Sequence, residues 1–152
     1  MGVGRRRARR DALFILYQMD LMRVDAESGL LRAERSGVLV DEYTRRLVRG
    51  AWECRDELDA ALQKHLRGWA LDRLAPLERN ILRMAAFELR ENSDVPTSVA
   101  LDEAVGLAKR YCSNEAGALV NGVLAALAAE RVTEHNGDAT GTEQGVDEPS
   151  AE

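Results

Sequence analysis

Aromatic residues, cysteine and histidine are scarce in this sequence. Aromatic side chains make up 5% of the 152 residues, and the chain has two cysteines and two histidines. Cys54 and Cys112 form no Cys-x-x-Cys pair, and His65 and His135 lie far apart in the chain. We therefore expect no metal site, no disulfide framework and no cofactor, and a reducing cytoplasm is the expected compartment.

Long uncharged segments are also missing. The run 12–19 has eight residues and the run 116–129 has 14. A membrane-spanning helix needs about 20 apolar residues, so neither run predicts one. The basic start followed by an apolar run is typical of a signal peptide, but no Ala-x-Ala cleavage site follows, and we predict none.

Motifs that would indicate an enzyme are absent from the sequence. There is no Gly-rich phosphate loop, no His-Glu-x-x-His zinc motif and no Gly-x-Ser-x-Gly nucleophile turn. Most carboxylates stand beside opposite charges, and Asp102 and Glu103 can simply favour the dipole at the start of a helix. The sequence predicts a protein that is not an enzyme.

The residues that are abundant favour helices. Hydrophobic residues make up 45% of the chain, and Ala, Leu, Arg and Glu, which lose little rotamer freedom in a helix, are common. Apolar spacing predicts helices from about residue 8, over 40–66, from Pro76, over 97–110 and from Ser113 or Asn114 onward. Residues 26–37 are predicted to be a loop with at most one helical turn. No segment alternates with period two, so the predicted fold is all-α, one compact bundle.

Charge is distributed unevenly along a chain whose net charge is −5. Residues 1–10 contain five arginines and no acid, whereas residues 132–152 contain six acids and no Lys or Arg. The latter segment has no apolar periodicity, so we predict a helical domain over 1–131 and a disordered acidic tail over 132–152. The tail could compete with RNA for the arginines, in which case deleting it should raise RNA affinity at low salt.

The arginine cluster is the strongest functional signal that composition alone provides. Arginines at i,i+4 repel one another, and the start of a helix is the wrong end for cations. Guanidinium groups bind phosphates bidentately and stack on bases, and arginine-rich segments commonly become ordered on RNA. From charge alone the cluster indicates nucleic-acid binding, with a membrane-surface contact or a merely solubilising terminus as alternatives.

Several longer motifs resemble one family. "RRRAR" leading into "LFILYQMD", then "LERNILRMAAFELRENSDVPTSVALDEAVGLAKRY" and "NEAGALVNGVLAALA", resemble the NusB family of bacterial transcription antitermination proteins. The resemblance covers roughly residues 5–130, with a poor match over 22–45. It implies two small helical subdomains packed together. It also implies binding of boxA RNA of ribosomal RNA operons together with NusE, a small-subunit ribosomal protein, in a complex that lets RNA polymerase read through terminators.

The resemblance also implies roles for individual residues. Residues matching RNA-binding positions are Arg5, Arg6, Arg7, Arg9, Arg10, Glu115 and Leu119, of which Arg10 stands where some members carry an acid. Leu119 stands where many members carry Phe, and a leucine cannot stack on a base as Phe does. Tyr17 and Glu78 match positions at the NusE contact, although from the sequence alone each could be an ordinary edge-of-core or first-turn residue.

Two other functions stay open at this point. A related helical domain precedes the catalytic domain of some RNA cytosine methyltransferases, although 152 residues leave no room for that catalytic domain. The other is a helical protein-interaction module that binds no RNA. A homodimer that covers the RNA surface is also compatible with the apolar positions near the arginines.

Overall fold

The structure is helical throughout the part of the chain that it describes. The computed structural model describes the backbone of residues 2–91 and 94–140 and the side chains of residues 4–91 and 94–131. Within these ranges there is no β-strand. The elements are α1 (Gly2–Met22), α2 (Ala26–Arg35), α3 (Glu42–Glu53), α4 (Arg55–Gln63), the 3-10 turn η1 (Leu71–Arg73), α5 (Pro76–Glu91), α6 (Thr97–Tyr111) and α7 (Asn114–Thr140). The all-α prediction is confirmed.

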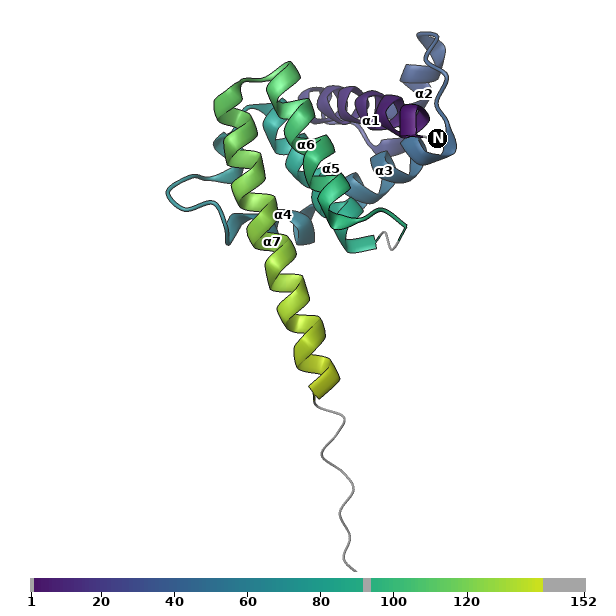
Figure 1. The fold of residues 1–152 in the computed structure, drawn as a ribbon. Helices are drawn as coiled ribbons and strands as arrows, with labels where there is room; N and C mark the ends of the chain where they lie inside the picture. Colours follow the sequence, from purple (N-terminus) through teal and green to yellow (C-terminus); the bar gives the residue numbers. More distant parts are fainter. Residues whose placement is uncertain (1, 92–93, 141–152) are drawn as a thin grey trace, which may run out of the picture.

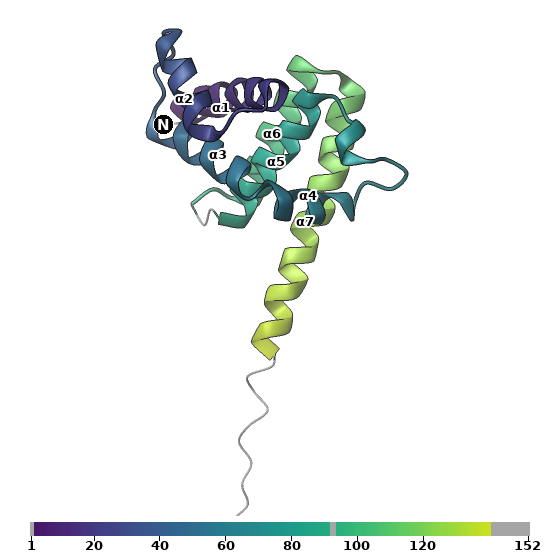
Figure 2. The ribbon, with the colours of Figure 1, turned by 180° about the vertical axis from the view of Figure 1, so that it is seen from behind.

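Helix α5 lies at the centre of the bundle (Figure 1). Every residue from Asn80 to Glu88 is buried, because α1, α3, α4, α6 and α7 all pack against this helix. On one side, α1, α2 and α3 also pack on one another, while α4, α6 and α7 occupy the remaining sides (Figures 1 and 2). The two groups share one continuous apolar core. This is the compact bundle of two small helical parts that the resemblance implied.

The predicted helix boundaries in the second half of the chain are confirmed. Pro76 occupies the first position of α5. A backbone N–H at that position has no acceptor within the helix, so proline, which has no N–H, loses no hydrogen bond there. Pro96 directly precedes α6. The Ser113 hydroxyl accepts a hydrogen bond of 3.0 Å from the backbone N–H of Ala116 and so caps α7.

The prediction of a loop over residues 26–37 is wrong, because α2 occupies most of it. The Asp25 carboxylate accepts a hydrogen bond of 2.8 Å from the Ser28 N–H, which caps the helix at its start. In the structure Gly29 is buried against the side chain of Met19, where a larger residue would not fit.

The single helix predicted over 40–66 is two helices, α3 and α4, separated at Cys54. Leu47, Val48, Leu58 and Leu62 are all buried, so the apolar period continues across the break even though the helix axis does not. The apolar period identifies which residues face the core, and it does not register a change in direction between two helices that share that core.

The end of α7 also differs from the prediction. The helix continues to Thr140, so residues 132–140 are helical rather than part of a disordered tail that begins at residue 132. A helix that is already nucleated extends at little cost per residue, and the polar composition of this segment does not prevent it. The last part of α7 projects away from the bundle (Figure 1). Residues 141–152 of the predicted tail lie outside the described residues.

Candidate nucleic-acid interface

The arginine cluster belongs to a helix that is anchored in the core. Ala8, Ala12 and Leu16 are buried on one face of α1, which fixes the orientation of its first turns. The side chains of Arg6 and Arg7 are 76% and 66% exposed, and that of Arg10 is 42% exposed. These three guanidinium groups therefore lie on the solvent side of α1.

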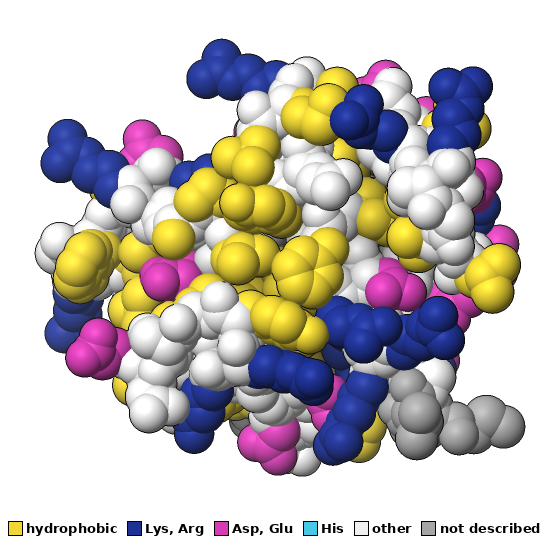
Figure 3. Space-filling view, turned by 90° about the horizontal axis from the view of Figure 1, so that it is seen from above, with side chains coloured by type: hydrophobic (Ala, Val, Ile, Leu, Met, Phe, Trp, Pro, Cys, Tyr) yellow, Lys and Arg dark blue, Asp and Glu magenta, His cyan; other side chains and the backbone are white. Residues whose placement is uncertain are grey.

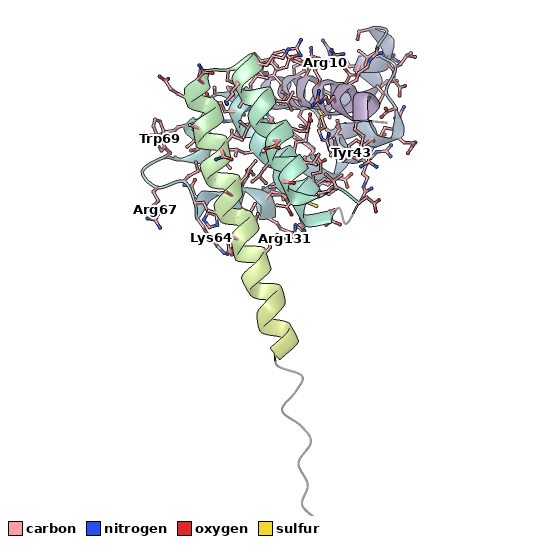
Figure 4. The ribbon with its side chains drawn as sticks, in the orientation of Figure 1. Arg10, Tyr43, Lys64, Arg67, Trp69 and Arg131 are labelled. Atoms are coloured by element: carbon pink, nitrogen blue, oxygen red, sulfur yellow. The ribbon has the colours of Figure 1, made fainter. Side chains whose placement is uncertain are left out.

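Arg5 and Arg9 lie nearer the bundle and meet the ring of Tyr43. The Arg5 guanidinium lies 4.7 Å from the ring centroid, and that of Arg9 lies 5.7 Å from it. Tyr43 comes from α3 and lies below α1 in Figure 4, whereas Arg10 lies above it. The cluster thus divides into an outer set, which is Arg6, Arg7 and Arg10, and an inner pair on Tyr43.

Arg9 does not occupy the exposed position that RNA contact requires. It is 4% exposed, and its Nε donates a hydrogen bond of 2.9 Å to Glu88 of α5. The Tyr43 hydroxyl donates to the same carboxylate at 2.8 Å. Burial by itself lowers the pKa of Arg9, but the hydrogen bond and charge of Glu88 outweigh it and raise that pKa above its ordinary value. Burial, and then the bond to Glu88, raises the pKa of Tyr43 to about 12. Arg9 therefore joins α1 to α5 as a permanent cation.

A groove of about 520 Å³ separates the start of α1 from α6. We call it the α1–α6 groove. Arg6, Arg7 and Arg10 line it on the α1 side, and α6 contributes Asp102, Glu103, Gly106, Leu107, Arg110 and Tyr111. Figure 3 looks down on this end of the molecule and shows Lys and Arg side chains gathered beside an apolar area. A surface that combines guanidinium groups, an aromatic ring and an apolar floor suits single-stranded RNA.

Arg110 and Tyr111 were not among the predicted site residues. Arg110 lies on the exposed side of α6, and its guanidinium is 5.6 Å from the centroid of the Tyr111 ring. The "KRY" segment carries a cation and an aromatic residue side by side, which was the available signal. Nothing in the sequence indicated that this end of α6 would face the arginines of α1.

Glu103 of α6 forms an ion pair with Arg6 of α1. Its Oε1 accepts a hydrogen bond of 2.9 Å from Arg6 Nε. A second groove of about 380 Å³ begins on the other side of this ion pair, between Arg5 and the segment around Pro96. The Arg6–Glu103 pair thus stands between two hollows at the basic end of the molecule.

Glu115 and Leu119 lie on the first turns of α7, just beyond the end of α6. Glu115 is exposed, and Leu119 is half-buried and packs against the core. Neither residue is among those that line the α1–α6 groove. Their predicted contact with RNA stays a prediction.

Tyr17 and Glu78 are both half-buried, on α1 and on the first turn of α5. Their helices are joined beside them, because Asp20 accepts hydrogen bonds of 2.9 Å from Arg79 and Asn80. Burial raises the pKa of the Cys112 thiol, and the charge of Glu78 raises it further. The contact with NusE stays a prediction, and it would involve the last turns of α1 and the first turn of α5.

Other kinds of site find no support in the described residues. Among them there is no group of three or more His, Cys, Asp or Glu side chains placed to hold a metal ion. No helix in the described ranges combines the length and the apolar character that crossing a membrane requires.

Comparison with known proteins places this architecture in one family. The model of the NusB family matches residues 6–129. The transcription antitermination protein NusB of Geobacillus kaustophilus is 42% identical over 125 residues, which cover 82% of this chain and 95% of that protein. A solved structure of T. maritima NusB has a TM-score of 0.76 and 33% identity, covering 88% of this chain and 96% of that one.

A structure of the antitermination factors NusB and NusE in complex with double-stranded RNA is also similar. Its matching chain has a TM-score of 0.74 and 33% identity, with 86% of this chain and 99% of that chain covered. The similar proteins are named for antitermination rather than for a reaction that they catalyse. On the family match and on these identities, the chain belongs to the NusB family.

Proposed function

We propose that this chain is a transcription antitermination factor that binds boxA RNA of ribosomal RNA operons together with NusE and helps RNA polymerase read through terminators. The α1–α6 groove is the observation that carries the proposal, because three arginines of α1 line one side of it, and Arg110 lies beside the Tyr111 ring on the other side. Family membership supports the same function. The site of action would be the cytoplasm, where the polymerase works.

Binding would begin with electrostatic capture of single-stranded RNA. Arg6, Arg7 and Arg10 would neutralise phosphates, with Arg5 at the edge, while Arg9 would hold the helix in place rather than contact RNA. If three to five phosphates are neutralised, log K should fall with log salt at a slope of roughly −2 to −3.5. Glu115 and Leu119 would extend the contact onto α7.

NusE would contact the face that carries Tyr17 and Glu78 and would add surface and base selectivity. In the similar complex structure, NusB is found with both NusE and RNA, which supports a shared platform. The α1 helix would serve both partners, since it carries the arginines at its start and Tyr17 two to three turns later.

The test is a binding series with boxA RNA and a scrambled RNA, with and without NusE, over a range of salt. We expect tighter binding to boxA when NusE is present, weakened by Arg6→Ala and by Arg7→Ala. Arg67→Ala is the matched control, because Arg67 lies on the loop after α4, far from Arg10 (Figure 4). Equal, weak binding to both RNAs that NusE does not improve would instead favour a helical interaction module without an RNA function.

A further inference from the structure

Two parallel rows of side chains on α6 face the α1–α6 groove. Residues four apart lie above one another on a helix, so Asp102, Gly106 and Arg110 form one row and Glu103, Leu107 and Tyr111 form the next. The second row meets α1, because Glu103 pairs with Arg6 and Tyr111 packs against Phe14. The first row forms the outer wall of the groove.

Gly106 leaves a gap in the middle of this wall. A glycine inside an exposed helix costs about 1 kcal/mol relative to alanine. Packing does not require it here, since a Cβ at Gly106 would meet no atom within 4 Å. The missing side chain therefore keeps the groove open at the point between Asp102 and Arg110.

The aromatic end of the groove is held in a fixed orientation. Tyr111 is half-buried, and its ring meets that of Phe14 edge-on, with centroids 5.0 Å apart and planes at 82°. The Arg110 guanidinium lies beside the Tyr111 ring. Aromatic rings and guanidinium planes are the surfaces on which unpaired bases stack.

We propose that the α1–α6 groove is a subsite for one nucleotide of the bound RNA. Its base enters the gap at Gly106 and lies against Tyr111 and Arg110, while its phosphate is held by Arg7 and Arg10 on the opposite wall. The volume of about 520 Å³ is within the range of small-ligand sites. The inference deepens the proposed function and rests on it.

The chemistry of the wall indicates which bases fit. The Asp102 carboxylate lies on the same row as Gly106, one turn away, and a carboxylate accepts hydrogen bonds but donates none. Carboxylates recognise the exocyclic amino group of bases such as cytosine. The subsite therefore selects a base that carries an amino group, and Asp102 is its specificity-determining residue.

The test combines one protein variant with a scan of the RNA. An abasic nucleotide is placed at each position of the boxA RNA in turn, and affinity is measured for the wild-type chain with NusE present. We expect one position at which removing the base weakens binding about tenfold or more, as loss of one stacked base does. Gly106→Gln fills the gap, so this variant should bind intact RNA as weakly as the wild type binds RNA that is abasic at that position. Making the RNA abasic there should not weaken binding by Gly106→Gln any further.

Gly106→Ala is the matched control, because a single methyl group leaves most of the gap open. Thermal unfolding should show both variants at least as stable as the wild type, so that weaker binding does not reflect misfolding. At the sensitive position, replacing the base by an analogue without its amino group should weaken binding by the wild type and leave binding by Asp102→Ala unchanged.

Two results would overturn the subsite. One is an abasic profile that is the same for the wild type and for Gly106→Gln at every position. The other is an analogue effect that persists in Asp102→Ala. If Arg6→Ala and Arg7→Ala still weaken binding in either case, the proposed function stands and only the subsite is lost. If neither arginine matters, the proposed function fails and the subsite fails with it.

Discussion

At the scale of single residues, neighbouring arginines of α1 have opposite environments. Arg7 is mostly exposed, and its Nε lies 4.0 Å from Asp11, a distance at which a surface pair contributes little. Arg9, two residues later, is buried and bonded to Glu88. The sequence shows the same residue type at both positions, and only the position of α5 decides which arginine faces solvent.

This contrast predicts that the same substitution changes the stability of the fold very differently at the two positions. Arg9→Met should destabilise the fold by about 3–5 kcal/mol, because it leaves the carboxylate of Glu88 buried without its cation. Arg7→Met should change the free energy of unfolding by no more than about 0.5 kcal/mol. Urea unfolding measures both. Equal, small effects would mean that the Arg9–Glu88 pair does not stabilise the bundle.

Glu103 should weaken RNA binding in the native protein. A phosphate that approaches Arg6 must displace the carboxylate bonded to its Nε. Glu103→Gln keeps the size of the side chain and removes the charge, so RNA affinity should rise about 2- to 5-fold, as expected for loss of a partly exposed ion pair of up to about 1 kcal/mol. Titration with labelled RNA at low salt checks this. A weaker complex would show that Glu103 assists RNA instead.

At the scale of helices, the apolar pattern predicted which residues are buried better than it predicted where a helix changes direction. The starts of α5, α6 and α7 followed from Pro76, Pro96 and Ser113, whose roles are local and therefore visible in the sequence. The break between α3 and α4 was missed, because both helices bury their apolar faces in the same core. The groove residues of α6 were missed for a related reason, since the packing angle between α1 and α6 depends on contacts from distant parts of the chain.

Two glycines lie in the middle of helices, and replacing each by alanine should change thermal stability in opposite directions. At Gly50 in α3 a Cβ would overlap the ring of Phe87 from α5. Overpacking costs about 1–3 kcal/mol, and the gain of about 1 kcal/mol in helix propensity offsets only part of it. We expect Gly50→Ala to lower the unfolding midpoint and Gly106→Ala to raise it slightly. Differential scanning calorimetry of the two variants, run side by side, makes the comparison, and a rise for both would contradict the close packing of α3 on α5.

At the scale of the whole molecule, a polar cluster joins both helical groups. Asp20 of α1 accepts hydrogen bonds from Arg79 and Asn80 of α5, and Arg83 of α5 binds Asp59 of α4 at 2.7 Å. Asn80 is fully buried. The cluster lies at the opposite end of α1 from the Arg9–Glu88 pair, so α1 is fixed to α5 at two points.

The cluster predicts how stability depends on acid. Burial by itself raises the pKa of Asp20, but the hydrogen bonds and charges of Arg79, Asn80 and Arg83 outweigh it, so the pKa lies below its ordinary value. The folded state therefore binds this proton less readily than the unfolded state. The stabilisation is present above the unfolded pKa of about 4 and is lost as the pH falls through the lower, folded value.

Asp20→Asn should lower the free energy of unfolding by about 1–3 kcal/mol near neutral pH, the range for a hydrogen bond to a charged group. The difference from the wild type should begin to shrink below about pH 4, where Asp20 of the unfolded chain takes up a proton, and should vanish as the pH falls through the lower pKa of the folded state. Unfolding curves over this pH range provide the measurement. A difference that stayed constant with pH would mean that the charge of Asp20 contributes nothing.

The attachment of α1 at both ends has a consequence for the speed of recognition. Arginine-rich segments that are disordered must fold as they bind, and the loss of chain entropy is subtracted from their affinity. Here the basic segment is the first part of a helix whose other residues already belong to the core. RNA that binds it would meet a preorganised surface, so association should be governed by diffusion and by charge steering, and most sequence discrimination should be found in how long the complex lasts.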